Sequence, residues 1–133
     1  MKMQSNKMKV KKIKVATLTG ALLDYWVVKA LGYRLAAWKG GYRVFDSNGD
    51  VSGYIGNVAP RPITLFKMSP STDWSQGGPI IDREEIELVH RNGMDGLTLW
   101  AIKGNVIMRG ETKLIAAMRA YVASKLGEEV DEI

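Results

Sequence analysis

Residues 69–81 hold the side chains of this chain that are best suited to binding a ligand. Two prolines, two glycines and a tryptophan stand there among hydroxyl, carboxyl and amide groups, which marks an irregular connection between two apolar regions. Functional side chains gather on such connections because rigid elements on either side hold them in place. The candidates in this segment are Ser71, Thr72, Asp73, Trp74 and Gln76.

These five side chains offer the groups that a small phosphorylated or nucleotide-like molecule requires. The hydroxyls of Ser71 and Thr72, together with amides at the start of a helix, can donate hydrogen bonds to an anion. Trp74 offers a face for stacking, and Asp73 and Gln76 offer acceptors to a sugar or a base. The segment therefore indicates a site for a ligand of this class.

A structural interpretation of the same segment needs no ligand. In that interpretation Ser69 or Ser71 caps a short helix, Trp74 fills part of the core, and residues 77–78 end the turn. Helix caps and buried tryptophans are far commoner in proteins than ligand sites, so we favour the structural interpretation over the functional one.

Two arginines elsewhere in the chain are candidate partners for a phosphate. Guanidinium groups form paired, charge-assisted hydrogen bonds with phosphate oxygens, which makes Arg61 and Arg119 the natural choices. The alternative for Arg119 is an ordinary solvated position on the surface of a helix, with its aliphatic stem against apolar neighbours.

Basic residues are concentrated at the beginning of the chain. Removing the six lysines that precede residue 15 from the net charge of +5 leaves the rest of the chain at −1. A basic arm can contact nucleic-acid phosphates, although a solvated tail is the commoner role and no arginine cluster accompanies these lysines. The nucleic-acid candidates in the arm are Lys7, Lys9, Lys11, Lys12 and Lys14.

Catalytic and metal-binding motifs are missing from the sequence. His90 is the single histidine and has no partner at a ligand spacing, and no nucleophile-elbow motif presents a serine. Residues 77–79 lack the Lys-Ser/Thr pair of a phosphate loop, and the chain contains no cysteine. We therefore favour binding over catalysis, and we expect no catalytic residue, no metal and no cofactor.

Length and composition indicate one globular domain. The chain has 133 residues, of which 46% are hydrophobic and 25% charged, and these are ordinary values for a folded domain. It has no apolar run of membrane-spanning length and no secretory signal, so we expect a cytoplasmic protein. We predict a disordered basic leader at residues 1–9, a single α+β domain at residues 10–130 and an acidic tail at residues 131–133.

Two segments show the apolar spacing of helices that bury one face. In residues 17–32, Thr19 is placed to accept a hydrogen bond from the first-turn amides and Gly32 to supply a left-handed residue at the end. The second helix is predicted between Thr112 as its N-cap and Gly127 as its C-cap.

Short strands are expected between these helices. Residues 33–38, 42–45 and 51–55 are rich in aromatic and β-branched side chains, and Asn48-Gly49 tolerates the positive φ angles of a tight hairpin. The fold class that follows is α+β, with a small, mostly antiparallel sheet packed against two α-helices. Further strands are predicted at residues 63–68 and 85–90, and a second hairpin at residues 97–102 and 106–108.

Three stretches of the chain resemble the NinX-like proteins of tailed bacteriophages and prophages. These are residues 18–25, 69–81 and 114–130, which occur in the order that the family shows. Lys113 departs from the family pattern, which has a proline after the capping threonine, and residues 1–7 look like an extension. The family is a domain of unknown function, so the resemblance implies a phage or prophage accessory protein and assigns no catalytic residue.

Two functions follow as hypotheses. The first is sequestration of a small phosphorylated or nucleotide-like ligand, such as a host immune signal, which would give the phage a counter-defence role. The alternative is a module that uses the basic arm to bind nucleic acid or a host protein. We expect no membrane partner, and the sequence permits a homo-oligomer.

Overall fold

A computed structural model describes residues 10–56, 66–93 and 96–133. Within these ranges the chain forms three α-helices, one short 3-10 helix and nine strands. The helices are α2 (Gly20–Ala30), α3 (Trp74–Arg83) and α4 (Lys113–Leu126), and the 3-10 helix is η1 (Val15–Thr17). The strands are β1 (Lys12–Lys14), β2 (Arg34–Trp38), β3 (Gly41–Phe45), β4 (Val51–Ile55), β5 (Phe66–Lys67), β6 (Glu87–Gly93), β7 (Gly96–Lys103), β8 (Val106–Gly110) and β9 (Glu129–Asp131).

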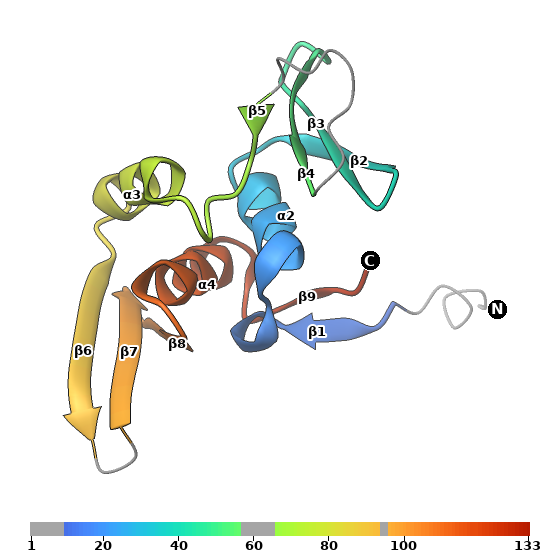
Figure 1. Ribbon diagram of the computed structural model, residues 1–133. Helices are drawn as coiled ribbons and strands as arrows, with labels where there is room; N and C mark the ends of the chain where they lie inside the picture. The colour runs from blue at the N-terminus through green and yellow to red at the C-terminus, as the bar shows by residue number, and fades with distance from the viewer. Residues whose placement is uncertain (1–9, 57–65, 94–95) are drawn as a thin grey trace, which may run out of the picture.

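Helix α4 is the centre of the main hydrophobic core. Nine of its fourteen residues are buried, and it packs against β7 and β8 on one side and against α2 and α3 on the other (Figure 1). Its four alanines are buried, and their small side chains let the neighbouring elements approach closely. The helix begins where the sequence predicts, because Thr112 Oγ1 accepts a hydrogen bond from the N–H of Ile115 at 3.0 Å.

The three-stranded sheet β6-β7-β8 is antiparallel and covers α4 with one face. Its register places Leu88 opposite Ala101 and Ala101 opposite Met108, and these side chains pack into the core. The residues that alternate with them face away from α4. The hairpin between β7 and β8 is the second one predicted from the sequence, and it is confirmed.

The four-stranded sheet β2-β3-β4-β5 packs against α2. Strands β2, β3 and β4 are antiparallel, and β5 pairs with β4 in the parallel direction. Val44 and Ile55 face Val28 of α2 and form a second, smaller hydrophobic cluster. The predicted hairpin around Asn48-Gly49 is confirmed, and Gly49 has the expected positive φ of 87°.

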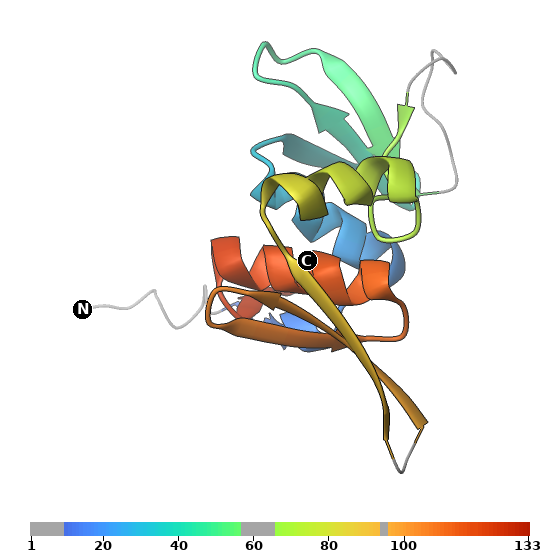
Figure 2. The ribbon, with the colours of Figure 1, turned by 90° about the vertical axis from the view of Figure 1, so that its left-hand side faces the viewer.

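Seen from the side, the helices lie between the two larger sheets. Figure 2 shows the four-stranded sheet above α2 and α3, with α4 below them and the three-stranded sheet at the bottom. The α+β class and the mostly antiparallel pairing agree with the sequence prediction. The strands of the described residues form three sheets, however, and three α-helices cover them, where the sequence suggested one sheet and two helices.

The third sheet joins the two ends of the described chain. Strand β1 pairs with β9 in the antiparallel direction, and Lys12 Nζ lies 2.6 Å from Asp131 Oδ1. We expected Asp131 in an acidic tail, but the structure makes it the last residue of a strand. The predicted leader, residues 1–9, lies outside the described residues.

The prediction for residues 69–81 is wrong about where the helix begins and ends. Asp73 is the N-cap in place of Ser69 or Ser71, and α3 continues through residues 77–78 to Arg83. Gly77 lies buried inside the helix, where the absence of a side chain leaves room for Leu114 of α4 and for the carbonyl oxygen of Pro70. A strand was predicted at residues 63–68, and β5 covers residues 66–67 of that range. Residues 63–65 lie outside the described part.

Helix α2 is shorter than the helix predicted at residues 17–32, because Thr17 belongs to η1 and the α-helix begins after Thr19. Thr19 is the N-cap, but its side chain makes no capping hydrogen bond. Gly32, with φ of 105°, follows the end of the helix as expected. None of the helices in the described ranges has the length and apolar character needed to cross a lipid bilayer.

Candidate functional site

Asp73 is the residue that organises the start of α3. Its Oδ1 accepts hydrogen bonds from the backbone N–H and the hydroxyl of Ser75, at 2.9 and 2.7 Å, and its Oδ2 accepts one from Gln76 Nε2 at 3.1 Å. The hydrogen bonds from Ser75 lower the pKa of Asp73, so its carboxylate stays charged at neutral pH. The positive end of the helix dipole therefore already has a negative partner, and a phosphate placed there would be repelled by it.

Gln76 ties the segment before α3 to β5. Its Oε1 accepts from the backbone N–H of Ser69 at 2.8 Å, and its Nε2 donates to the backbone carbonyl of Lys67 at 2.9 Å. Because both ends of the side-chain amide have protein partners, Gln76 fixes the shape of this region. A ligand would have to displace one of these bonds to use the amide.

Ser71 is buried and is held by a carboxylate of α2. Its side chain and backbone are 1% exposed, and its backbone N–H donates to Asp24 Oδ1 at 2.8 Å. Asp24 is itself 5% exposed, and burial raises its pKa against the opposing effect of the hydrogen bonds from Ser71. Thr72 next to it is exposed. Of the two hydroxyls that we expected to meet an anion, that of Ser71 is buried and that of Thr72 donates to the carbonyl of Ser69 at 3.4 Å.

Replacing Asp24 with alanine should lower the free energy of unfolding by about 1–3 kcal/mol, because the buried N–H of Ser71 would lose its acceptor. Asparagine at this position keeps an acceptor oxygen and removes the buried charge. Because burial raises the pKa of Asp24 above its ordinary value of 3.8, the stability it contributes is full below pH 3.8 and is lost as the pH rises through the folded-state pKa. Asp24→Asn should therefore match the wild type in acid and be the more stable of the two at neutral pH.

Urea denaturation of the wild type and the two Asp24 variants, repeated between acidic and neutral pH, measures both effects. Alanine and asparagine variants of equal stability would show that the Ser71 N–H does not depend on this acceptor. An Asp24→Asn variant whose gain in stability over the wild type appears in acid instead of at neutral pH would contradict the direction of the pKa shift.

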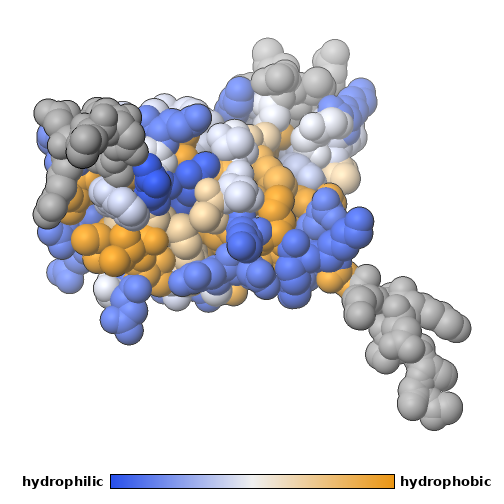
Figure 3. Space-filling model, turned by 90° about the horizontal axis from the view of Figure 1, so that it is seen from below, coloured by the Kyte–Doolittle hydropathy of each residue, from blue (hydrophilic) through white to orange (hydrophobic). Residues whose placement is uncertain are grey.

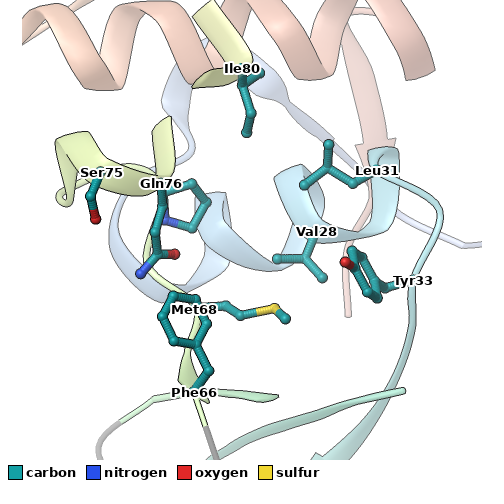
Figure 4. A pocket seen from close by; sticks show the side chains of 9 residues that line it. Val28, Leu31, Tyr33, Phe66, Met68, Ser75, Gln76 and Ile80 are labelled. Carbon is teal, nitrogen blue, oxygen red and sulfur yellow. The ribbon is translucent and has the colours of Figure 1, made fainter. Parts of the chain in front are cut away.

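A groove between α2, β5 and α3 is lined in part by the candidate residue Gln76. Its volume is about 270 Å³, and Figure 4 shows side chains from the three elements turned toward one space. Uncharged side chains line it throughout, and Phe66 at its edge is 55% exposed. The lining residues are Val28, Leu31, Tyr33, Phe66, Met68, Pro70, Ser75, Gln76 and Ile80.

Trp74 lies at a second, smaller depression. Its side chain is 53% exposed. The structural interpretation, which placed this side chain in the core, is therefore wrong on this point. This depression has a volume of about 180 Å³ between the starts of α3 and α4. Its lining residues are Ser71, Thr72, Trp74, Thr112, Leu114 and Ile115. The structure thus divides the five predicted residues of this segment, with Gln76 at the larger groove and Trp74 at the smaller depression.

Of the two candidate arginines, the structure describes Arg119, and it lines neither cavity. Arg119 donates from Nε to the carbonyl of Leu18 and from Nη1 to the carbonyl of Arg109, both at 2.8 Å. It therefore connects α4 to the loop after η1 and to β8, and burial lowers its pKa. Arg61 lies outside the described residues.

Part of the basic arm lies opposite acidic residues. Lys12 and Lys14 of β1 are paired in register with Asp131 and Glu129 of β9. The backbone N–H of Glu132 also donates to the carbonyl of Lys11. These acids reduce the positive charge that the described part of the arm offers to a phosphate. Lys7 and Lys9 lie outside the described residues.

The groove residues from β5 and α2 were missed by the sequence analysis. Phe66 and Met68 lie in an apolar run that indicates a strand, and no local signal separates an exposed aromatic residue from a core one. Tyr33 and Val28 belong to segments interpreted as strand and helix core. Within the described ranges, no group of three or more histidine, cysteine or acidic side chains is placed to hold a metal ion.

A further apolar depression, of about 460 Å³, lies on the face of β6-β7-β8 that is turned away from α4. Its lining residues are Glu87, Val89, Trp100, Ile102 and Ile107. Figure 3 shows hydrophobic residues gathered on this side of the molecule when it is seen from below. Ile107 there is 56% exposed, nearly the same fraction as Phe66.

Comparison with known proteins gives one result that extends over most of the chain. The family model described as "Bacteriophage P22, NinX" matches residues 14–125, which include α2, α3, all of α4 except its last residue, and the lining of the three cavities described above. A search of the curated proteins found no match.

Proposed function

Since this chain belongs to the bacteriophage P22 NinX family and is therefore a phage accessory protein, we propose that it acts by binding. We propose further that the groove between α2, β5 and α3 holds the ring of a small nucleotide-like molecule. The observation that carries this proposal is the lining of the groove, which places the aromatic rings of Tyr33 and Phe66 beside an uncharged space of about 270 Å³.

The chemistry of the groove suits a base better than a phosphate. Small-molecule sites are concave and mostly apolar, with a few polar groups that fix the orientation of the ligand. Here the apolar surface comes from Val28, Leu31 and Ile80, and polar atoms come from Tyr33 and Ser75. A base has two apolar faces and polar edges, so it can replace water in such a space without leaving a charge buried.

The phosphate of such a ligand would remain outside the groove. The carboxylate of Asp73 and the uncharged lining both disfavour an anion inside it. The groove thus supports a nucleotide-like ligand over a compact phosphorylated one. Stoichiometric capture of a nucleotide-like host signal would serve a phage as counter-defence.

Replacing Phe66 with alanine should weaken binding of the ligand by about tenfold or more, because stacking of a base on an aromatic ring is worth about 1–3 kcal/mol. Native mass spectrometry of protein purified from phage-infected cells identifies what the wild type carries. Calorimetric titration with AMP and ATP then measures the affinity of the wild type and the variant. The matched control is Ile107→Ala, which removes an equally exposed apolar side chain from the other large sheet.

Equal loss of affinity in the Phe66 and Ile107 variants would mean that the groove is not the site. A wild-type protein that carries no small molecule from infected cells and binds neither nucleotide would overturn the proposal. The alternative function, nucleic-acid or host-protein binding by the basic arm, has less support, because β9 places acidic residues beside Lys12 and Lys14.

A further inference from the structure

The face of β2-β3-β4 that is turned away from α2 carries a second set of chemically distinctive side chains. Val44 and Ile55 point to α2 and are almost fully buried, so the residues that alternate with them point to the opposite face. In register, Arg43 lies between Ala36 of β2 and Tyr54 of β4. This outer face is defined by Arg34, Trp38, Arg43, Phe45 and Tyr54, and Lys39 follows at the end of β2.

Aromatic and basic side chains alternate across this outer face. The guanidinium of Arg43 stacks over the ring of Trp38 with its Cζ 3.6 Å from the ring centroid, and Lys39 Nζ lies 5.1 Å from the same centroid. Arg34 lies directly opposite Phe45 in the register. Three aromatic rings from three adjacent strands are thus interleaved with three cations.

Acidic side chains are missing from the strands that make this face. The residues of β2, β3, β4 and β5 include no aspartate or glutamate. The acid that follows β3, Asp46, accepts hydrogen bonds from the backbone N–H groups of Asn48 and Asp50 and so belongs to the hairpin turn. The face is therefore positively charged, although the chain without its first lysines is close to neutral.

Two donors in the Trp38–Arg43 stack are also unused. The indole Nε1–H of Trp38 and the Nε–H of Arg43 are buried in the stack and have no hydrogen-bond acceptor in the part of the chain that the structure describes. Buried donors are nearly always paired in folded proteins. A phosphate or carbonyl oxygen brought to this face, with a small movement of the stack, would supply the missing acceptor.

We propose that this outer face binds single-stranded nucleic acid. Aromatic side chains on an open sheet stack unpaired bases, and neighbouring arginines and lysines neutralise the phosphates between them. Two interstrand spacings separate β2 from β4, or about 10 Å, which gives room for about two or three bases. Phe45, Tyr54 and the guanidinium plane of Arg43 provide the stacking surfaces, and Arg34 and Lys39, both exposed, contact the backbone. The ring of Trp38 holds Arg43 in position.

This site is separate from the groove and from the basic arm. The groove lies on the α2 side of the sheet, and the outer face is the opposite side. The lysines of the arm are on β1 or before it, in a different sheet. Each site can therefore fail its test while the other succeeds.

Fluorescence anisotropy with labelled oligo-dT and oligo-U strands of about ten nucleotides tests the proposal on the full chain. Trp38→Ala should weaken binding by about tenfold, and Arg34→Gln should lower the slope of log affinity against log salt by about 0.7, the loss of one phosphate contact on a single strand. Preference for oligo-U would show that the face also reads the 2′-hydroxyl, and equal affinity would show that it reads bases and phosphates alone.

The sheet β6-β7-β8 supplies a matched control. Arg109 lies over Trp100 at 5.1 Å, the same pair of residue types on the outer face of a different sheet. Trp100→Ala and Arg109→Gln should leave the affinity unchanged. Equal losses from the Trp38 and Trp100 variants would overturn the proposal, and so would a wild type that binds neither strand at about 100 µM, the weak end of non-specific binding.

Stability is measured alongside, so that a misfolded variant is not mistaken for a binding defect. If Trp38→Ala lowers the melting temperature, Arg34→Gln decides the question, because Arg34 is exposed and makes no core contact. An Arg34→Gln protein with the wild-type salt slope would overturn the assignment of Arg34 to the backbone.

Discussion

Replacing Trp26 with alanine should lower the free energy of unfolding by about 3–5 kcal/mol, whereas the same change at Trp74 should alter it by less than about 0.5 kcal/mol. Trp26 is 8% exposed in the main core, and Tyr25 meets it edge to face with ring centroids 5.0 Å apart. The indole N–H of Trp26 has no acceptor in the described part of the chain, so the cost comes from lost packing. Trp74 is 53% exposed and leaves no cavity when it is truncated.

Chemical denaturation of the two tryptophan variants under one set of conditions gives the comparison directly. A Trp74→Ala protein that loses several kcal/mol would mean that its ring belongs to the core, as the structural interpretation of residues 69–81 first held. A Trp26→Ala protein as stable as the wild type would contradict the position of α2 in the core.

Replacing Gly77 with alanine should destabilise the protein by about 1–3 kcal/mol, while alanine at the adjacent Gly78 should change stability by less than about 0.5 kcal/mol. A Cβ on Gly77 would lie 2.5 Å from Leu114 Cδ1 and 2.5 Å from the carbonyl oxygen of Pro70. Helix α3 would have to move away from α4 to accept it.

Gly78 is the internal control for this contact. The nearest atom to a Cβ at that position is Trp74 Cε3 at 3.8 Å, which is ordinary van der Waals contact. Alanine gains helical propensity there, and crowding by the ring of Pro79 offsets part of the gain. Thermal unfolding of both variants measures the difference, and equal effects at the two positions would show that the α3–α4 contact is not as close as described.

The Gly77 variant also bears on the groove. Gln76 and Ile80, which line it, stand on α3 beside Gly77, so a displacement of α3 would change the width of the cavity. Weakened ligand binding in Gly77→Ala, with normal binding in Gly78→Ala, would connect the packing of α3 to the proposed function. The Asp24 variants test the same relation between packing and binding from the α2 side, because Asp24 accepts the hydrogen bond from the N–H of Ser71.

The amino-acid sequence by itself determined the features of this protein that depend on a few neighbouring residues. Thr112 and Gly127 mark the two ends of α4, and Asn48-Gly49 marks the turn between β3 and β4. A side-chain cap, a left-handed residue and a tight turn each depend on residues within about four positions of one another. The same local character made three segments recognisable as those of a NinX-like protein, and the family match over residues 14–125 agrees.

The tertiary structure alone decided what depends on residues far apart in the chain. Gly77 lies within α3 where Leu114 occupies the space that a side chain would need, and Arg119 reaches carbonyls 10 and 101 positions away. The register of β2, β3 and β4 assembles the aromatic and basic outer face from separate strands. The packing of elements and the pairing of strands set the distances between residues that are far apart in the chain, and the type of each residue does not specify them. For this reason neither the groove nor the outer face could be found from the sequence.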